Sequence, residues 1–303
     1  MHLVTPDIFS SLLAMPDGIF TRQDALRSGM SDEVLTAGCR RGVIVRICRG
    51  AYTRPGEWTK GEHRRLLARA ALRVYPDAVL ASGTAVEAHG VPTFEVAVIR
   101  TDICRPIARE AFTEQLRIRP LRQEPVATPW GPAVPLPDAL AQTAVDHGIP
   151  AGVASIDAAL HERRVSMHEL EAVREAMAGT PRSSRLTCAL AWADAAAESL
   201  GESVTRVALR GAGLEVESQV DIADQDGVFV GRVDLRIKGT RVLLEFDGKV
   251  KYTEGGTDAL FREKKREDRL RALGYVVVRL TWADLFHTDR IIAAVTAALA
   301  VAA

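Results

Sequence analysis

Three acidic residues interrupt apolar segments in the last third of the chain, and their types and spacing could hold a metal ion. In residues 241–248 (RVLLEFDG), the two-residue period of a β-strand places Glu245 and Asp247 on one face. Two carboxylates on one face of an apolar strand repel each other and are costly to desolvate, and a bound divalent cation relieves both effects. Asp234 interrupts a second apolar segment, residues 231–237, and a hairpin between the two segments would bring it to the same edge. Carboxylate oxygens of this kind suit Mg²⁺ or Mn²⁺.

The elements around these acids predict a mixed sheet flanked by helices. The sequence favours, in order, a helix, three strands, a strongly charged helix, a fourth strand and a last helix. These elements are predicted over residues 184–210, 215–223, 228–237, 241–247, 258–273, 275–280 and 289–301. In the simpler alternative, the three acids only solvate an exposed edge of this sheet.

The last third of the chain resembles a known group of nucleases. It is similar to the DUF559 group of the PD-(D/E)XK superfamily, which is related to very-short-patch repair endonucleases, and the resemblance implies a restriction-endonuclease-like fold. The resemblance is carried by Gly201-Glu202-Ser203, Gln219, Asp234, Glu245-Phe246-Asp247-Gly248, the charged helix over residues 263–271, Gly274-Tyr275 and Arg279. It implies hydrolysis of DNA phosphodiesters with Mg²⁺ or Mn²⁺ held by Asp234, Glu245 and Asp247. Glu202 would then be an additional ligand of the metal or of its water.

One departure from that group concerns the catalytic cation. The superfamily carries Glu-x-Lys where this chain has Glu245-Phe246-Asp247, so a cation near the attacking water must come from elsewhere. Lys251 is the favoured candidate and Lys249 lies two residues away; in the alternative, both are surface charges or phosphate contacts. Arg266 on the charged helix is a candidate phosphate contact, and the alternative there is a solvated helix face with pairs of opposite charge.

The N-terminal segment has the element order of a winged helix-turn-helix. Helices are predicted over residues 5–14, 21–29 and 31–41, and two short strands follow over 43–48 and 51–54. The third helix would enter the major groove, and the hairpin would contact the DNA backbone as the wing. Arginine contacts with phosphate give salt-dependent affinity without sequence specificity. The candidate DNA contacts are Arg40, Arg41, Arg46, Arg49 and Arg54. In the alternative, this small domain mediates only protein contacts.

This segment resembles the winged-helix domain of AbiEi-type antitoxins from abortive-infection systems. The resemblance is carried by residues 18–21 (GIFT), 40–46 (RRGVIVR), 49–53 (RGAYT) and 80–92 (LASGTAVEAHGVP). It implies a protein that binds operator DNA, represses its own operon and opposes a nucleotidyltransferase toxin. A toxin or a second copy of the chain is therefore a candidate partner besides DNA.

Composition narrows the remaining possibilities. A chain of 303 residues, of which 47% are hydrophobic, predicts two or three folded domains. The net charge is zero, yet between residues 40 and 73 ten Lys and Arg stand against two Glu. The four cysteines lack the spacing of a zinc site. We see neither a signal peptide nor an apolar run of the ~20 residues needed to span a bilayer, which predicts a cytoplasmic protein without membrane contact.

These patterns together predict a multi-domain α/β (α+β) chain. The expected parts are a winged-helix domain over residues 1–92, a mixed α/β connecting domain over 93–182 and a nuclease-like domain over 183–303. The favoured function is a DNA-binding endonuclease that depends on a divalent metal, because the acidic set is joined to a basic winged helix. The alternative is a non-catalytic DNA-binding regulator or antitoxin with a degenerate nuclease fold, because the usual lysine is missing.

Overall fold

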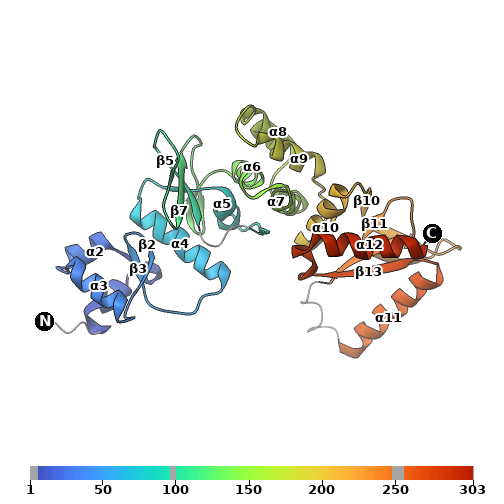
Figure 1. The fold of residues 1–303 in the computed structure, drawn as a ribbon, viewed down its shortest axis with the longest axis horizontal. Coiled ribbons are helices and arrows are strands. Elements are labelled where there is room, and N and C mark those ends of the chain that lie inside the picture. The colour runs from blue at the N-terminus through green and yellow to red at the C-terminus, as the bar shows by residue number, and fades with distance from the viewer. Residues whose placement is uncertain (1–5, 96–99, 248–255, 303) are drawn as a thin grey trace. The chain divides into compact units, whose positions relative to one another are not determined.

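The computed structural model describes residues 6–95, 100–247 and 256–302, and of residues 6, 7 and 256–263 only the backbone. The chain is a mixed α/β protein, as predicted, and its strands form three sheets. It divides into two compact units (Figure 1): Met1–Val91 with Glu95–Asp146, and Pro92–Phe94 with His147–Ala303. The strands of the expected middle domain and its helix over residues 136–147 lie almost wholly in the first unit, and its later helices lie in the second, so the three-domain division stays a prediction.

The first unit begins with the arrangement of a winged helix. Its elements are η1 (Pro6–Phe9), α1 (Ser10–Leu13), η2 (Pro16–Gly18), β1 (Phe20–Thr21), α2 (Arg22–Arg27), α3 (Asp32–Arg40), β2 (Val45–Cys48) and β3 (Ala51–Thr53). A 3-10 turn and one α-helical turn replace the single helix expected over residues 5–14. Thr21 starts α2 as expected, because its hydroxyl accepts from the Asp24 backbone N–H while the Asp24 carboxylate accepts from that of Thr21. The added strand β1 pairs with β3, and Phe9, Phe20 and Leu35 are part of the core.

A six-stranded sheet forms the rest of the first unit, in the order β6-β7-β5-β4-β9-β8. Its elements are α4 (Lys60–Val74), β4 (Val79–Leu80), α5 (Ser82–Ala88), β5 (Thr101–Arg105), β6 (Ala111–Phe112), β7 (Leu116–Pro120), β8 (Val126–Thr128), β9 (Gly131–Ala133) and α6 (Leu136–His147). The sequence of residues 95–100 favours a strand, and most of that segment falls on 96–99, which lie outside the described residues. Very short strands separated by proline-rich segments explain why this sheet was not predicted as one sheet.

Helices open the second unit: α7 (Ile149–His161), α8 (Met167–Ala176), α9 (Ser183–Trp192) and α10 (Leu200–Gly211). A capping box formed by Ser166 and Glu169 starts α8. The single helix expected over residues 184–210 is wrong, because the chain leaves the helix at Ala193 in an extended conformation. A new helix begins at Ser199, whose hydroxyl accepts from the Glu202 backbone N–H.

The C-terminal sheet has the predicted order of elements. It contains β10 (Val216–Ala223), β11 (Phe229–Ile237), β12 (Val242–Asp247) and β13 (Val276–Thr281), with α11 (Gly256–Ala272) between β12 and β13, followed by η4 (Asp284–Phe286) and α12 (Thr288–Ala302). The first three strands are antiparallel, and β13 is parallel to β12. Consecutive residues Leu243 and Leu244 point to opposite faces. Leu244 packs with the core formed by α10 and α12, and Leu243 packs with Leu270 of α11, so helices cover both faces (Figure 1).

Candidate functional site

Four polar side chains occupy the same level in the four strands of the C-terminal sheet. Gln219 in β10 lies opposite Asp234 in β11, as the paired residues on either side of both show. The register between β11 and β12, continued by one residue, sets Asp234 beside Glu245. Glu245 in turn is the parallel partner of Arg279 in β13. We call Gln219, Asp234, Glu245 and Arg279 the polar row. The sequence resemblance includes all four of these positions, and the register explains why they lie together.

Asp234 holds two strands together at this level. Its Oδ2 accepts a hydrogen bond from the backbone N–H of Phe246 at 2.8 Å. The ladder between β11 and β12 has its last pair at Leu235 and Leu244, so the carboxylate takes over from the backbone where that ladder ends. The expected hairpin therefore forms and brings Asp234 next to the strand that carries Glu245 and Asp247.

Glu202 reaches the polar row from α10. The residue is 5% exposed, and its carboxylate accepts from the Ser199 hydroxyl at 2.7 Å, the Glu198 backbone N–H at 3.0 Å and the Gln219 amide at 2.9 Å. Gln219 has a φ of 52°, a left-handed conformation rare for a residue with a side chain. Burial raises the pKa of Glu202, and the negative charge of Asp234 raises it further. Glu202 and Asp234 thus lie close enough for their charges to interact.

Glu245 is held by two guanidinium groups. Its side chain is 14% exposed and lies 2.5 Å from Nη2 of Arg266 and 3.7 Å from Nη2 of Arg279. The same nitrogen of Arg279 lies 2.8 Å from Glu267 on α11. Arg266, a candidate phosphate contact, donates to Glu245 in this structure. The negative charge of Glu245 is therefore balanced inside the unit.

These contacts bear on whether the residues fit a divalent metal. Among the side chains that the structure describes, those of residues 8–95, 100–247 and 264–302, no three or more His, Cys, Asp or Glu are grouped to hold a metal ion. Asp247 lies half-buried at the end of β12, and the expected lysines, Lys249 and Lys251, lie outside the described residues. Oxygen donors of the right kind are present, yet Glu245 already binds Arg266. As arranged here, the carboxylates do not fit Mg²⁺ or Mn²⁺.

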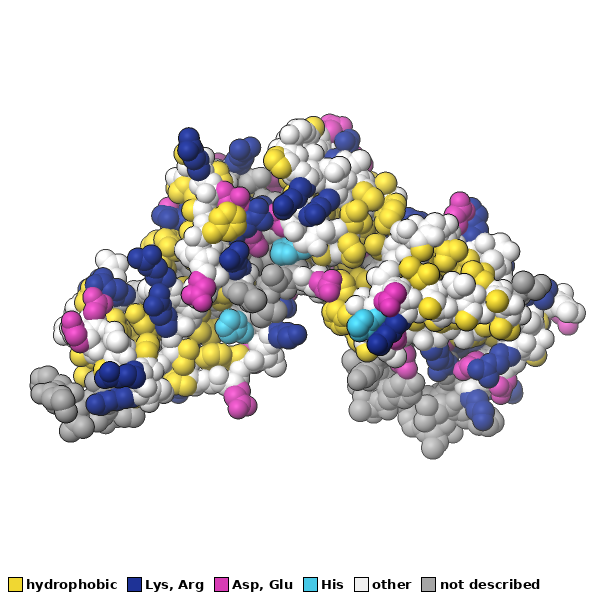
Figure 2. Space-filling model, in the orientation of Figure 1, with side chains coloured by type: hydrophobic (Ala, Val, Ile, Leu, Met, Phe, Trp, Pro, Cys, Tyr) yellow, Lys and Arg dark blue, Asp and Glu magenta, His cyan; other side chains and the backbone are white. Residues whose placement is uncertain are grey.

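The five arginines predicted to contact DNA are all exposed on the winged helix. Within the described residues, no ion pair involves Arg40, Arg46, Arg49 or Arg54, and Figure 2 shows Lys and Arg side chains at the surface of this segment. Arg40 ends α3, Arg46 lies in β2, and the other two lie at the turn and end of the hairpin. Their charges face solvent and are available to an anion.

The basic residues of α4 behave differently, which the sequence did not reveal. Three of its arginines pair with acids of the same unit: Arg64 with Glu87, Arg69 with Asp17 and Arg73 with Asp24. These acids lie 23 to 52 positions away in the chain, so only the fold brings them together. The basic stretch of residues 40–73 thus separates into an exposed hairpin and a helix whose charges are partly neutralised.

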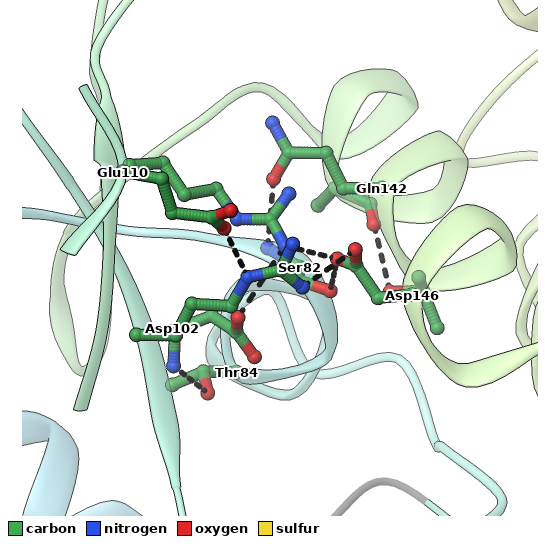
Figure 3. A network of polar contacts seen from close by, with 10 residues as sticks. Ser82, Thr84, Asp102, Glu110, Gln142 and Asp146 are labelled. Carbon is green, nitrogen blue, oxygen red and sulfur yellow. Dashed lines mark hydrogen bonds and ion pairs between the residues drawn. The ribbon is translucent and has the colours of Figure 1, made fainter. Parts of the chain in front are cut away.

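A second polar network was missed altogether (Figure 3). The Ser82 hydroxyl at the start of α5 donates to Asp146 of α6 at 2.8 Å, and Arg117 and Arg119 of β7 donate to the same carboxylate. Asp102 of β5 lies 3.5 Å from Arg119, and burial raises the pKa of Asp102 to about 6. These residues come from four elements and are scattered over more than 60 positions, so no local spacing could indicate them. Each contact fastens one element of the first unit to another.

One comparison with known proteins agrees with the winged-helix geometry. Residues 11–55, from α1 to the end of the hairpin, match the family model described as "Transcriptional regulator, AbiEi antitoxin". This match supports the resemblance to AbiEi-type antitoxins for the N-terminal part, while the resemblance to DUF559 nucleases stays a prediction. No curated protein matches the chain. Among the helices in the described ranges, none is long and apolar enough to cross a membrane.

Proposed function

We propose that this protein is a DNA-binding transcriptional regulator of the antitoxin type, which binds duplex DNA through its winged helix. The observation that carries the proposal is the set of exposed arginines Arg40, Arg46, Arg49 and Arg54, for which the described residues supply no acidic partner. The family match over residues 11–55 supports it. A regulator of this kind acts in the cytoplasm, where the DNA is.

The exposed face of α3 refines how the winged helix would meet DNA. Asp32, Thr36 and Arg40 are exposed at intervals of four residues and therefore share one face of the helix. Asp32 at the start of this face is 2.5 Å from Arg22, which offsets its charge. We expect Thr36 and Arg40 to approach the groove and the hairpin arginines to contact phosphates on either side.

Binding to the protein's own promoter tests the proposal. Footprinting should show protection of a defined site, which weakens for Arg46→Ala and Arg49→Ala because each variant loses a phosphate contact. Asp234→Ala is the matched control, since Asp234 lies in the other unit and should leave protection unchanged. If the purified protein binds no duplex even at low salt, the proposal is wrong.

The family match also suggests a protein partner. A nucleotidyltransferase toxin is the partner that the antitoxin resemblance implies, and a second copy of this chain is the other candidate. Co-expression with a toxin encoded beside the gene, followed by co-purification, distinguishes a heterocomplex from a homodimer.

The C-terminal unit has a second candidate function, an endonuclease that requires Mg²⁺ or Mn²⁺. The order helix, three strands, helix, strand and the meeting of Glu202, Asp234 and Glu245 at the polar row favour it. Asp247 and a lysine, Lys251 or Lys249, would complete the set. The ion pair between Glu245 and Arg266 opposes it. Incubation with plasmid or single-stranded DNA and either metal tests it: equal background cleavage by the wild type and Glu245→Ala would remove this candidate.

A further inference from the structure

Arg266 spans the space between α11 and the polar row. Its Nη2 lies 2.5 Å from Oε1 of Glu245, and its Nη1 donates to the backbone carbonyl of Arg232 at 3.3 Å. Gly231 makes room for the arginine stem, because a Cβ at that position would lie 2.9 Å from Cδ of Arg266. The guanidinium group of Arg266 is therefore held by the Arg232 carbonyl of β11 and the Glu245 carboxylate of β12, beside the space left by Gly231. We call this position the seat of Arg266.

To bind a metal ion, Glu245 would have to be released from Arg266. Glu245 is 14% exposed and Arg266 is 22% exposed, so both charges are largely removed from water and each needs the other. A divalent cation bound to Glu245 would lie beside the guanidinium, and two positive charges at that distance repel strongly in a half-buried site. Arginine and metal are thus mutually exclusive at this carboxylate.

We propose that Arg266 is a latch that takes the place of a divalent cation at Glu245 and keeps the polar row closed to metal. The row opens to Mg²⁺ or Mn²⁺ only when Arg266 leaves its seat. The proposal goes beyond DNA binding by the winged helix and does not depend on it. It also accounts for a sheet that brings carboxylates together without grouping them as metal ligands.

Titration of the full-length protein with Mn²⁺ alone, followed by electron paramagnetic resonance of the free ion, tests the latch. Arg266→Gln should bind Mn²⁺ at least about tenfold more tightly than the wild type, because the competing charge is gone. Arg271→Gln is the matched control: Arg271 lies on the same helix and pairs with Glu267, not with Glu245, so the affinity should stay at the wild-type value. Adding Glu245→Gln to Arg266→Gln should abolish the gain.

A second variant keeps the test decisive if Arg266→Gln fails to fold. Gly231→Ala leaves every charge in place and forces the arginine stem away from β11, so it should also increase Mn²⁺ affinity. If the wild type binds Mn²⁺ as tightly as the variants, the latch is wrong and the endonuclease candidate gains. If neither folded variant binds Mn²⁺ more tightly than the wild type does, and all bind weakly, both the latch and a metal at Glu245 are excluded. Promoter binding remains a separate measurement in every case.

Discussion

Replacement of Arg206 by methionine should destabilise the second unit severely. Arg206 is fully buried on α10, and its guanidinium donates to Asp157 of α7, which is 1% exposed, and to the carbonyl of Trp192. Methionine fills much of the volume but leaves the Asp157 carboxylate buried without its cation. Removal of one partner of a buried ion pair costs about 3–5 kcal/mol. In a unit of this size, each kcal/mol of lost stability lowers the melting temperature by about 2–4 °C, so the expected fall is roughly 6–20 °C.

Thermal and urea unfolding followed by circular dichroism measure this effect. The control is Arg232→Met, because Arg232 and Asp221 form a comparable pair whose side chains are 56% and 54% exposed, and loss of a solvated pair should change the melting temperature little. The double replacement of Arg206 by methionine and Asp157 by leucine removes both buried charges. It should be less destabilised than Arg206→Met alone, because no buried charge is left unpaired, although the Asp194 backbone N–H loses its acceptor.

The pH dependence gives the same prediction an independent check. Burial raises the pKa of Asp157, and the charge of Arg206 opposes that rise. Without Arg206 the folded protein holds the Asp157 proton more tightly than the unfolded chain does. The variant should therefore be least destabilised at acidic pH and lose stability as the pH rises above the usual range of an aspartate. If Arg206→Met costs no more than Arg232→Met at any pH, the buried pair does not hold α7 to α10.

Three further predictions use other parts of the structure. Burial raises the pKa of Asp102 to about 6, so ionisation of Asp102 opposes folding as the pH rises. In urea unfolding, the wild type should lose up to roughly 3 kcal/mol of stability between pH 4 and 6, and Asp102→Asn should remove this loss. The same dependence of stability on pH in both proteins would contradict the assignment. Gly201→Ala should lower stability by about 1–3 kcal/mol in the same assay, since its Cβ would meet the Phe246 ring, whereas Gly211→Ala, with open space around it, should not. Arg46→Ala should reduce the slope of log affinity for duplex DNA against log salt by about 0.9, and an unaltered slope would show that Arg46 contacts no phosphate.

The order of elements could be predicted where apolar periodicity is regular and ends are marked. In the C-terminal sheet, the strands and helices follow segments with a clear period, and Gly274 ends α11 with a φ of 82°. The helix over residues 184–210 was predicted as one because its apolar pattern continues across residues 193–199. The break depends on Asp157, which accepts from the Asp194 backbone N–H at 2.7 Å. A partner 37 positions away leaves no local signal.

The candidate site was predictable in its residues and not in its contacts. Alternation along β12 is enough to place Glu245 on the face opposite Leu244, and the resemblance supplied Glu202. The partner of Glu245 could not be predicted, because Arg266 lies on a helix with many charged residues, and each of them could equally face solvent. Only Gly231, which leaves space for the arginine stem, decides which one turns inward. A glycine in an apolar strand was the one available signal, and a missing side chain is easily overlooked.

The two candidate functions differ in whether the charged side chains that they depend on are already balanced by other groups of the protein. In the C-terminal unit, Glu245 is balanced by Arg266 and Arg279, and Glu202 is satisfied by three hydrogen bonds, so these carboxylates need no external cation. On the winged helix, Arg46 and Arg49 have no ion pair among the described residues and are exposed, so they need an external anion or remain solvated. A polyanion therefore gains more from the N-terminal hairpin than a metal gains from the polar row. Because the exposed charges without an ion pair are positive and lie on a winged-helix arrangement, the proposal of DNA binding has more support than the proposal of DNA cleavage.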